Sequence, residues 1–234
     1  AFVDAALFRP VPRDHQQSDA AFRWRRICAA VTLLIGAALL GWSLQLPPGD
    51  PRFYWGTFAL AAAWAVGAVA SGPLHLGRGW TRRGFAQQEG ENVPVVQALV
   101  LGLLLLGLFL AGAVVVAQIP FLRRPVEELL DHASVGSFWL VLVITAVNGI
   151  AEELYFRGAL FAAIGRRHPV AISTIVYTLV TATSLIPLLT LAGALLGLVT
   201  GLQRRVTGGI LAPTITHLTW SIGMLFLLQP TLDA

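Results

Sequence analysis

Seven long runs of apolar residues dominate the chain, and short segments rich in proline, glycine or arginine separate them. A run of about 20 apolar residues is long enough to cross a bilayer as a helix. The pattern predicts membrane-spanning helices over residues 27–46, 53–71, 94–117, 138–164, 169–186, 187–205 and 208–228. Pro94, Pro169 and Pro187 each open one of these runs, and proline suits the first turn of a helix. The expected fold is therefore an all-α polytopic membrane protein with seven or eight transmembrane helices.

Composition supports this class. Of the 234 residues, 56% are hydrophobic and 12% are charged, with a mean hydropathy of +0.73. A soluble domain of this length cannot hide so much apolar surface. The net charge of +4 comes from arginine alone, because the chain has no lysine. Arginines at the ends of apolar runs indicate anionic lipid headgroups as partners and argue against nucleic acid. The single cysteine, Cys28, excludes an intramolecular disulfide. Abundant Ala, Arg and Gly without lysine is typical of a GC-rich bacterial source.

The arginines also predict the topology. Residues 1–26 form an arginine-rich tail, which we expect in the cytoplasm, and residues 118–137 form an amphipathic stretch expected on the outer surface. With the amino terminus inside, twelve of the sixteen arginines are cytoplasmic, Arg157 is intramembrane, and three are outside: Arg52, Arg123 and Arg124. This distribution satisfies the positive-inside rule. The sequence therefore predicts a multi-pass cell-membrane protein with a cytoplasmic amino terminus and a retained first helix.

The segment with the highest free-energy cost of membrane insertion is NGIAEELYFRG, residues 148–158. It places two carboxylates and a guanidinium within the fourth run. A charged side chain near the bilayer centre costs about 2.5–3.5 kcal/mol on insertion scales, so such groups pair with each other or face a functional cavity. Glu153 and Arg157 are four residues apart and can pair on one helical face. Glu152 is rotated by about 100° and needs a partner from another helix. The best candidate for that partner is His217.

Two interpretations of these charges remain open. Glu152 can act as a general base on a water molecule, with Asn148 one turn earlier to orient it. Alternatively, the charges form a buried network that only fixes helix packing. Tyr155 and Phe156 are expected to be packing residues.

A second candidate segment lies in the last apolar run. His217 and Ser221 share a helical face, and an imidazole with a hydroxyl can donate hydrogen bonds to a developing oxyanion. A single histidine in an apolar helix is more often a core residue, so only its neighbours support a functional role for His217. The nearby threonines are expected to form hydrogen bonds between helices; they are Thr214, Thr216 and Thr219.

These residues resemble the motifs of the CPBP family, the CAAX-protease and bacteriocin-processing intramembrane proteins, also called Abi. The resemblance covers residues 135–229 and rests on two motifs: Glu152-Glu153-x-x-x-Arg157-Gly158, and Arg204-Arg205-x-Thr-Gly-Gly-x-x-Ala-Pro-x-x-x-His217-x-x-x-Ser221. Residues 27–134 match only in being hydrophobic.

The resemblance implies a helical bundle around a polar intramembrane cavity. It also implies a hydrolase that cleaves peptide bonds, including those of prenylated CAAX proteins, although other members serve in bacteriocin self-immunity. Glu152 would activate water, Glu153 with Arg157 would hold the helix, and His217 with Ser221 would stabilise the oxyanion. The expected partners are membrane lipids and a peptide or membrane-protein substrate.

One position departs from the family pattern. The middle motif, an aromatic residue followed by three residues and then histidine, should lie in the fifth run, where the chain has Tyr177 and then Thr181 or Ser184. A hydroxyl cannot replace imidazole as a proton acceptor at neutral pH or as a zinc ligand. We therefore expect no metal and no other cofactor.

Two further functions compete with the endopeptidase. The first is a catalytically impaired accessory or scaffold subunit that binds a membrane-protein partner stoichiometrically. The second is a transporter, because Gly193, Gly197 and Gly201 form a ridge suited to close helix contact, although no inverted repeat accompanies it. The remaining histidines are expected in loops or at a helix end; they are His15, His75, His132 and His168.

Overall fold

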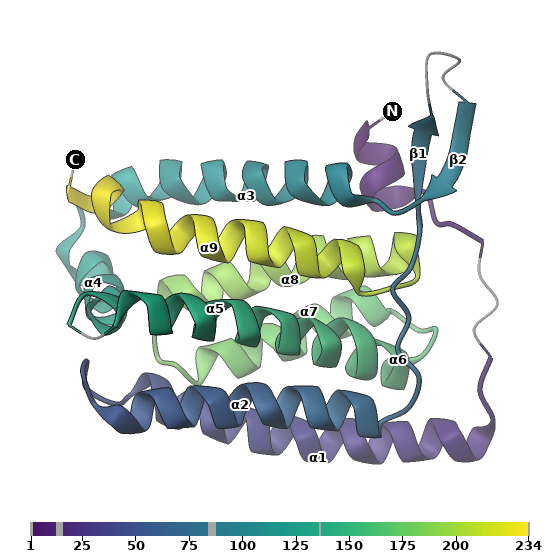
Figure 1. Cartoon of the computed structure of the whole chain (residues 1–234), viewed down its shortest axis with the longest axis horizontal. Coiled ribbons are helices and arrows are strands. Elements are labelled where there is room, and N and C mark those ends of the chain that lie inside the picture. Colours follow the sequence, from purple (N-terminus) through teal and green to yellow (C-terminus); the bar gives the residue numbers. More distant parts are fainter. Residues whose placement is uncertain (1, 13–15, 84–87, 136, 234) are drawn as a thin grey trace.

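A computed structural model describes residues 2–12, 16–83, 88–135 and 137–233 of the chain. Long helices lie side by side along one axis, and α4 lies across one end of the bundle (Figure 1). In chain order the elements are η1 (Asp4–Phe8), α1 (Asp19–Leu44), α2 (Pro51–Ala70), β1 (Gly79–Arg83), β2 (Gln88–Asn92), α3 (Val95–Val116), α4 (Pro120–Ser134), α5 (Phe138–Glu153), η2 (Leu154–Leu160), α6 (Phe161–Ile164), α7 (Pro169–Ala182), α8 (Pro187–Thr207) and α9 (Leu211–Asp233).

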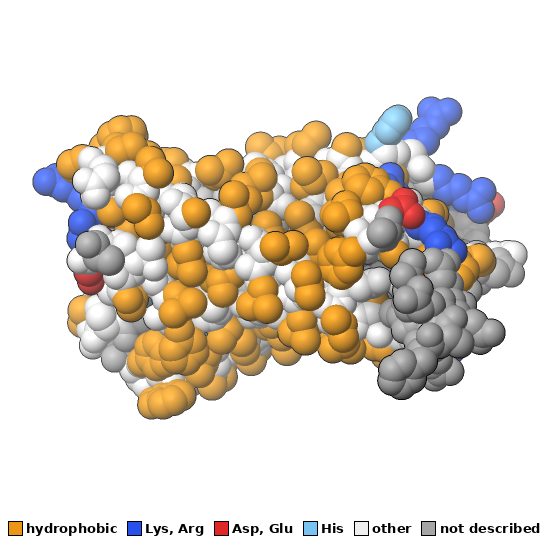
Figure 2. All heavy atoms as spheres, turned by 90° about the horizontal axis from the view of Figure 1, so that it is seen from above, with side chains coloured by type: hydrophobic (Ala, Val, Ile, Leu, Met, Phe, Trp, Pro, Cys, Tyr) orange, Lys and Arg blue, Asp and Glu red, His pale blue; other side chains and the backbone are white. Residues whose placement is uncertain are grey.

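The all-α polytopic fold predicted from the sequence is confirmed. Six helical segments are long and apolar enough to cross a membrane, and α5, η2 and α6 together form one of them, Phe138–Ile164. The fifth apolar run forms the shorter helix α7, of 14 residues. Figure 2 shows apolar side chains across the middle of one face of the molecule, with charged side chains at its two ends. This surface is that of a multi-pass membrane protein.

Two regions at the amino-terminal side differ from the expected boundaries. Helix α1 begins at Asp19, where Ser18 caps it by accepting a hydrogen bond from Ala21 N at 3.2 Å, so the expected tail already contains the first turns of α1. The glycine- and arginine-rich segment after α2, which the apolar pattern left without a predicted element, contains the antiparallel pair β1 and β2, with Gly79 opposite Asn92. The segment is mostly polar and lacks the alternation of apolar and polar residues that predicts a strand, so the sequence did not indicate this hairpin.

The first two helices pack directly around the acidic segment. Trp64 of α2 is 1% exposed and stacks on Tyr155 of η2, with ring centroids 4.4 Å apart. The Tyr155 hydroxyl donates to Ala29 O in α1 at 2.6 Å. A Cβ on Gly36 would overlap the Trp64 ring, so glycine is required at that position. Helices α1 and α2 therefore fix the position of η2.

An extended segment between α2 and β1 crosses the turn that joins α8 to α9. Ile210 N donates to His75 O at 2.9 Å, and Arg78 N donates to Thr207 O at the same distance. The two segments touch at Gly209, where a Cβ would lie 2.0 Å from the carbonyl carbon of Leu76. These backbone bonds satisfy polar groups at the ends of two helices, which would otherwise be unpaired.

Gly209→Ala should destabilise this crossing strongly. Because the added methyl group would meet backbone rather than a flexible side chain, we expect a loss of about 1–3 kcal/mol or more in the free energy of unfolding. Reversible unfolding in mixed detergent micelles measures the loss. The matched control is Gly107→Ala, because a Cβ at Gly107 in α3 has no neighbour within 4 Å. Equal stabilities of the two variants would contradict the role assigned to Gly209.

Candidate active site

A cavity of about 560 Å³ lies inside the bundle and is lined by residues from α1, α2, α3, α4, α5, η2, α7, α8 and α9. Its wall is mostly apolar and extends to α4 at the end of the bundle. The polar side chains on the wall come mainly from α5, α7 and α9, and they include Asn148, Glu152, Tyr177, His217 and Ser221. Sequence-distant polar residues thus meet in one hollow within the apolar body.

Glu153 is the centre of a fully buried charge cluster. Its Oε1 atom lies 3.1 Å from Arg157 Nη1 and 2.8 Å from His217 Nδ1. The side chains of Glu153 and Arg157 are 0% and 1% exposed. The expected pair of Glu153 and Arg157 is therefore present, but the expected direct partner of His217 was wrong, because the imidazole bonds to Glu153 rather than to Glu152.

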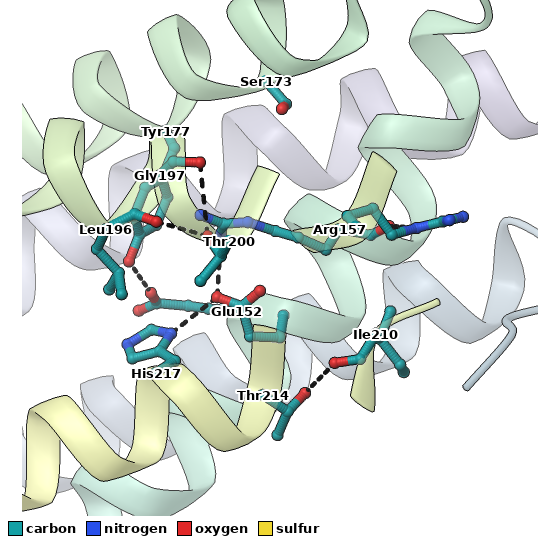
Figure 3. A network of polar contacts seen from close by, with 12 residues as sticks. Glu152, Arg157, Ser173, Tyr177, Leu196, Gly197, Thr200, Ile210, Thr214 and His217 are labelled. Atoms are coloured by element: carbon teal, nitrogen blue, oxygen red, sulfur yellow. Dashed lines mark hydrogen bonds and ion pairs between the residues drawn. The ribbon is translucent and has the colours of Figure 1, made fainter. Parts of the chain in front are cut away.

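Glu152 points into the cavity and has a different partner. Its Oε2 atom accepts a hydrogen bond of 2.6 Å from the hydroxyl of Tyr177 in α7. Figure 3 shows the Glu152 carboxylate beside the His217 ring, and both residues line the same cavity. The two groups named from sequence as general base and oxyanion donor therefore line one cavity, although no direct hydrogen bond joins them among the contacts of the described residues.

The helix widens to a π-helix directly after the two glutamates. Segment η2 runs from Leu154 to Leu160 and carries Arg157. Gly158 lies against the extended segment between α2 and β1, where a Cβ would come within 2.8 Å of Leu74 Cδ2. The side chain of Arg204 in α8 donates from Nε to the carbonyl oxygen of Arg157. Single π-helical turns inside α-helices frequently occur at functional sites, and here the widened turn orients the arginine toward Glu153.

Asn148 makes different contacts from those expected, whereas Ser221 lies on the cavity wall with His217. Asn148 donates from Nδ2 to Thr57 O at 3.1 Å and to Ile144 O at 3.0 Å, so it joins α5 to α2 rather than holding Glu152. Ser221 lines the cavity near His217. Within the described part of the chain, Ser221 Oγ is buried and has no hydrogen-bond partner. Its hydroxyl thus remains available to a bound group.

The structure distinguishes the two candidates for the missing histidine. Thr181 lines the cavity and donates from Oγ1 to Tyr177 O, one turn earlier, at 2.8 Å. Ser184 instead accepts a hydrogen bond from Ile186 N at 3.2 Å in the turn before α8. Of the two residues, Thr181 is therefore the one whose side chain lies on the cavity wall with Tyr177. The contact of Tyr177 with Glu152 was not predicted from the sequence. The only indication of it was that the aromatic residue of the middle motif carries a hydroxyl here.

The donor set does not fit a three-ligand zinc site. Among the described residues, no group of three or more His, Cys, Asp or Glu side chains is placed to hold a metal ion. Glu153 Oε1 already bonds to both His217 and Arg157, and Thr181 supplies only a hydroxyl where a third metal ligand would be needed. The expectation that the protein uses no cofactor remains a prediction.

The other histidines lie away from this cluster. His132 was expected in a loop, but it lies in α4, is buried, and contacts Leu46 O through Nε2 at 3.0 Å. His75 lies in the segment before β1, and His168 immediately precedes α7. His15 lies outside the described residues.

Comparison with known proteins gives one match. A sequence model described as type II CAAX prenyl endopeptidase Rce1-like matches residues 134–223. The matched segment contains both glutamates, Arg157, Tyr177, His217 and Ser221, and it confirms the resemblance drawn from the two motifs. No curated protein and no solved structure matches the chain.

Proposed function

We propose that this chain, whose residues 134–223 match the CAAX prenyl endopeptidase family, is an intramembrane endopeptidase that hydrolyses a peptide bond within its buried cavity. The observation that carries the proposal is the meeting of Glu152 and His217 on the wall of one cavity. A carboxylate and an imidazole from different helices, kept together at a depth where each is costly, are the groups that hydrolysis of an amide requires.

In the proposed reaction, Glu152 takes a proton from a water molecule as the water oxygen attacks the carbonyl carbon of the substrate. The oxyanion that forms accepts hydrogen bonds from His217 Nε2 and from Ser221 Oγ. The C–N bond then breaks, and Glu152 returns its proton to the departing amine. Glu152 and His217 end in the states in which they began.

The contacts of Glu153 support the role of His217 as a donor. Glu153 Oε1 lies 2.8 Å from His217 Nδ1 and 3.1 Å from Arg157 Nη1. Glu153 accepts from His217 Nδ1, which leaves Nε2 as the ring atom directed away from that bond. Glu153 therefore holds the ring, Arg157 holds Glu153, and His217 offers Nε2–H to the cavity.

Hydrolysis in ¹⁸O-labelled water tests the activity directly. The purified protein in lipid nanodiscs is incubated in H₂¹⁸O with a farnesylated peptide that ends in a CAAX sequence. We expect release of the last three residues and one ¹⁸O atom in the new carboxylate, both read by mass spectrometry. The Glu152→Gln protein, purified in parallel, controls for contaminating proteases. Intact peptide after prolonged incubation with the wild-type protein would contradict the proposal.

A non-catalytic accessory subunit is the second candidate function, and Thr181 favours it. A threonine occupies the position of the family's histidine, and its donor is already used by its own helix. For this function the protein would bind a membrane-protein partner at a fixed ratio. Purification from its native membrane in mild detergent, followed by native mass spectrometry, distinguishes the two candidates, because a monomer that cleaves peptide excludes the accessory role.

The orientation in the membrane is part of the same proposal. The end of the bundle that carries the amino terminus and the hairpin also carries Arg166 and Arg167, which follow α6, and the two arginines at the end of α8. We place this end in the cytoplasm, next to anionic lipid headgroups, by the positive-inside rule.

A further inference from the structure

The middle motif lacks its imidazole, yet α7 still supplies a polar group to the catalytic carboxylate. Thr181 does not supply it, because its single donor bonds to Tyr177 O at 2.8 Å. The group is the Tyr177 hydroxyl, which donates to Glu152 Oε2 at 2.6 Å. A hydrogen bond from a hydroxyl to a carboxylate is of the strong, charge-assisted kind.

The ring of Tyr177 is fixed by its neighbours. It packs edge-on against Phe156 with ring centroids 4.6 Å apart. The guanidinium carbon of Arg157 lies 4.5 Å from the centroid of the same ring, which is the geometry of a cation–π contact. On the other side, Gly197 of α8 allows close approach, because a Cβ there would lie 3.1 Å from Tyr177 Cδ1. Gly197 therefore lets α8 pack closely against the ring of Tyr177.

We propose that Tyr177 is the positioning residue of Glu152. Its hydroxyl fixes the Glu152 carboxylate and its ring fixes Arg157, so one side chain positions both Glu152 and the charge cluster around Glu153. This inference rests on the proposed endopeptidase function. Tyr177 thereby compensates in part for the loss of the imidazole at position 181.

The geometry gives this arrangement a definite chemical consequence. With Oε2 held by the phenol, Oε1 of Glu152 is left to accept the proton of the attacking water. The phenol is neutral, so it orders the carboxylate without adding charge to a buried cluster. Through Arg157 and Glu153, the same ring is connected to His217.

Tyr177→Phe tests the hydroxyl alone, because phenylalanine keeps the ring beside Phe156 and Arg157. We expect kcat to fall by about 10- to 100-fold with KM nearly unchanged, because a hydrogen bond to a charged group is lost while substrate contacts remain. The matched control is Tyr155→Phe, which removes another buried hydroxyl, bonded to Ala29 O at the same distance of 2.6 Å. Its kcat should stay near the wild-type value. Equal kcat values for the two variants would overturn the assignment.

A spectroscopic readout separates this inference from the proposed function. The infrared difference spectrum of wild-type protein minus Glu152→Gln isolates the carboxyl band of Glu152. We expect this band to shift when the same difference is taken in the Tyr177→Phe background and to keep its frequency in the Tyr155→Phe background. An unshifted band in Tyr177→Phe would overturn the inference even if the protein is a peptidase. A shifted band in a protein that cleaves no peptide would support the contact and reject the endopeptidase.

Discussion

Glu152→Gln should reduce kcat for peptide cleavage by about 10²–10⁴-fold, which is the usual contribution of a general base. The amide oxygen of glutamine can still accept a hydrogen bond from Tyr177, so the side chain keeps its position while losing its ability to take a proton. KM should change little, because the substrate contacts the surrounding apolar wall. Initial rates with a farnesylated peptide, measured on protein in nanodiscs, give both constants.

The control for this prediction is Glu128→Gln. Glu128 is an exposed glutamate of α4 whose replacement changes the charge without touching the cluster around Glu153. Its kcat should equal that of the wild type. If Glu152→Gln cleaves as fast as Glu128→Gln, the base is a different group and the mechanism proposed for Glu152 fails.

The second large effect concerns stability. Arg157→Met should lower the free energy of unfolding by about 3–5 kcal/mol, because it leaves the carboxylate of Glu153 buried with His217 as its only partner in the cluster. Methionine keeps much of the arginine's apolar stem, so lost packing contributes little. Unfolding by sodium dodecyl sulfate in mixed micelles, followed by circular dichroism, provides the measurement.

Two further variants show whether charge is the cause of that loss. Adding Glu153→Gln to Arg157→Met removes the uncompensated charge and should restore a large part of the stability. Arg52→Met breaks the ion pair between Arg52 and Asp50. Because the Arg52 side chain is 67% exposed, this change should have little effect on the free energy of unfolding. Similar losses for Arg157→Met and Arg52→Met would show that burial of the pair does not govern its contribution.

Much of the fold follows from the sequence because lipid imposes simple rules. Each spanning segment must satisfy its own backbone, so long apolar runs predict helices, and prolines mark where several of them begin. Pro169 and Pro187 lie at the first positions of α7 and α8. The pair of Glu153 and Arg157 was also predictable, because a spacing of four places two side chains on one helical face.

The partner of His217 could not be predicted in the same way. Glu152 and Glu153 are neighbours, and the choice between them depends on how α5 is rotated against α9. That rotation is set by contacts distant in sequence, such as Gly149 against Leu218, and no spacing within one helix reports it. Tyr177 was missed for a related reason, since its role depends on how closely α7 approaches α8 at Gly197.

The shortness of α7 has a consequence for the surrounding membrane. At 1.5 Å per residue its 14 residues span about 21 Å, whereas the hydrocarbon region of a bilayer is about 30 Å thick. Its outward face is apolar, with Ile175 and Leu179 exposed, and Leu185 is exposed in the turn that follows. A bilayer accommodates such a short apolar segment by local thinning, by snorkelling of flanking residues or by oligomerisation of the protein. Because α7 carries Tyr177, the thickness of the host bilayer acts directly on the helix that contacts Glu152.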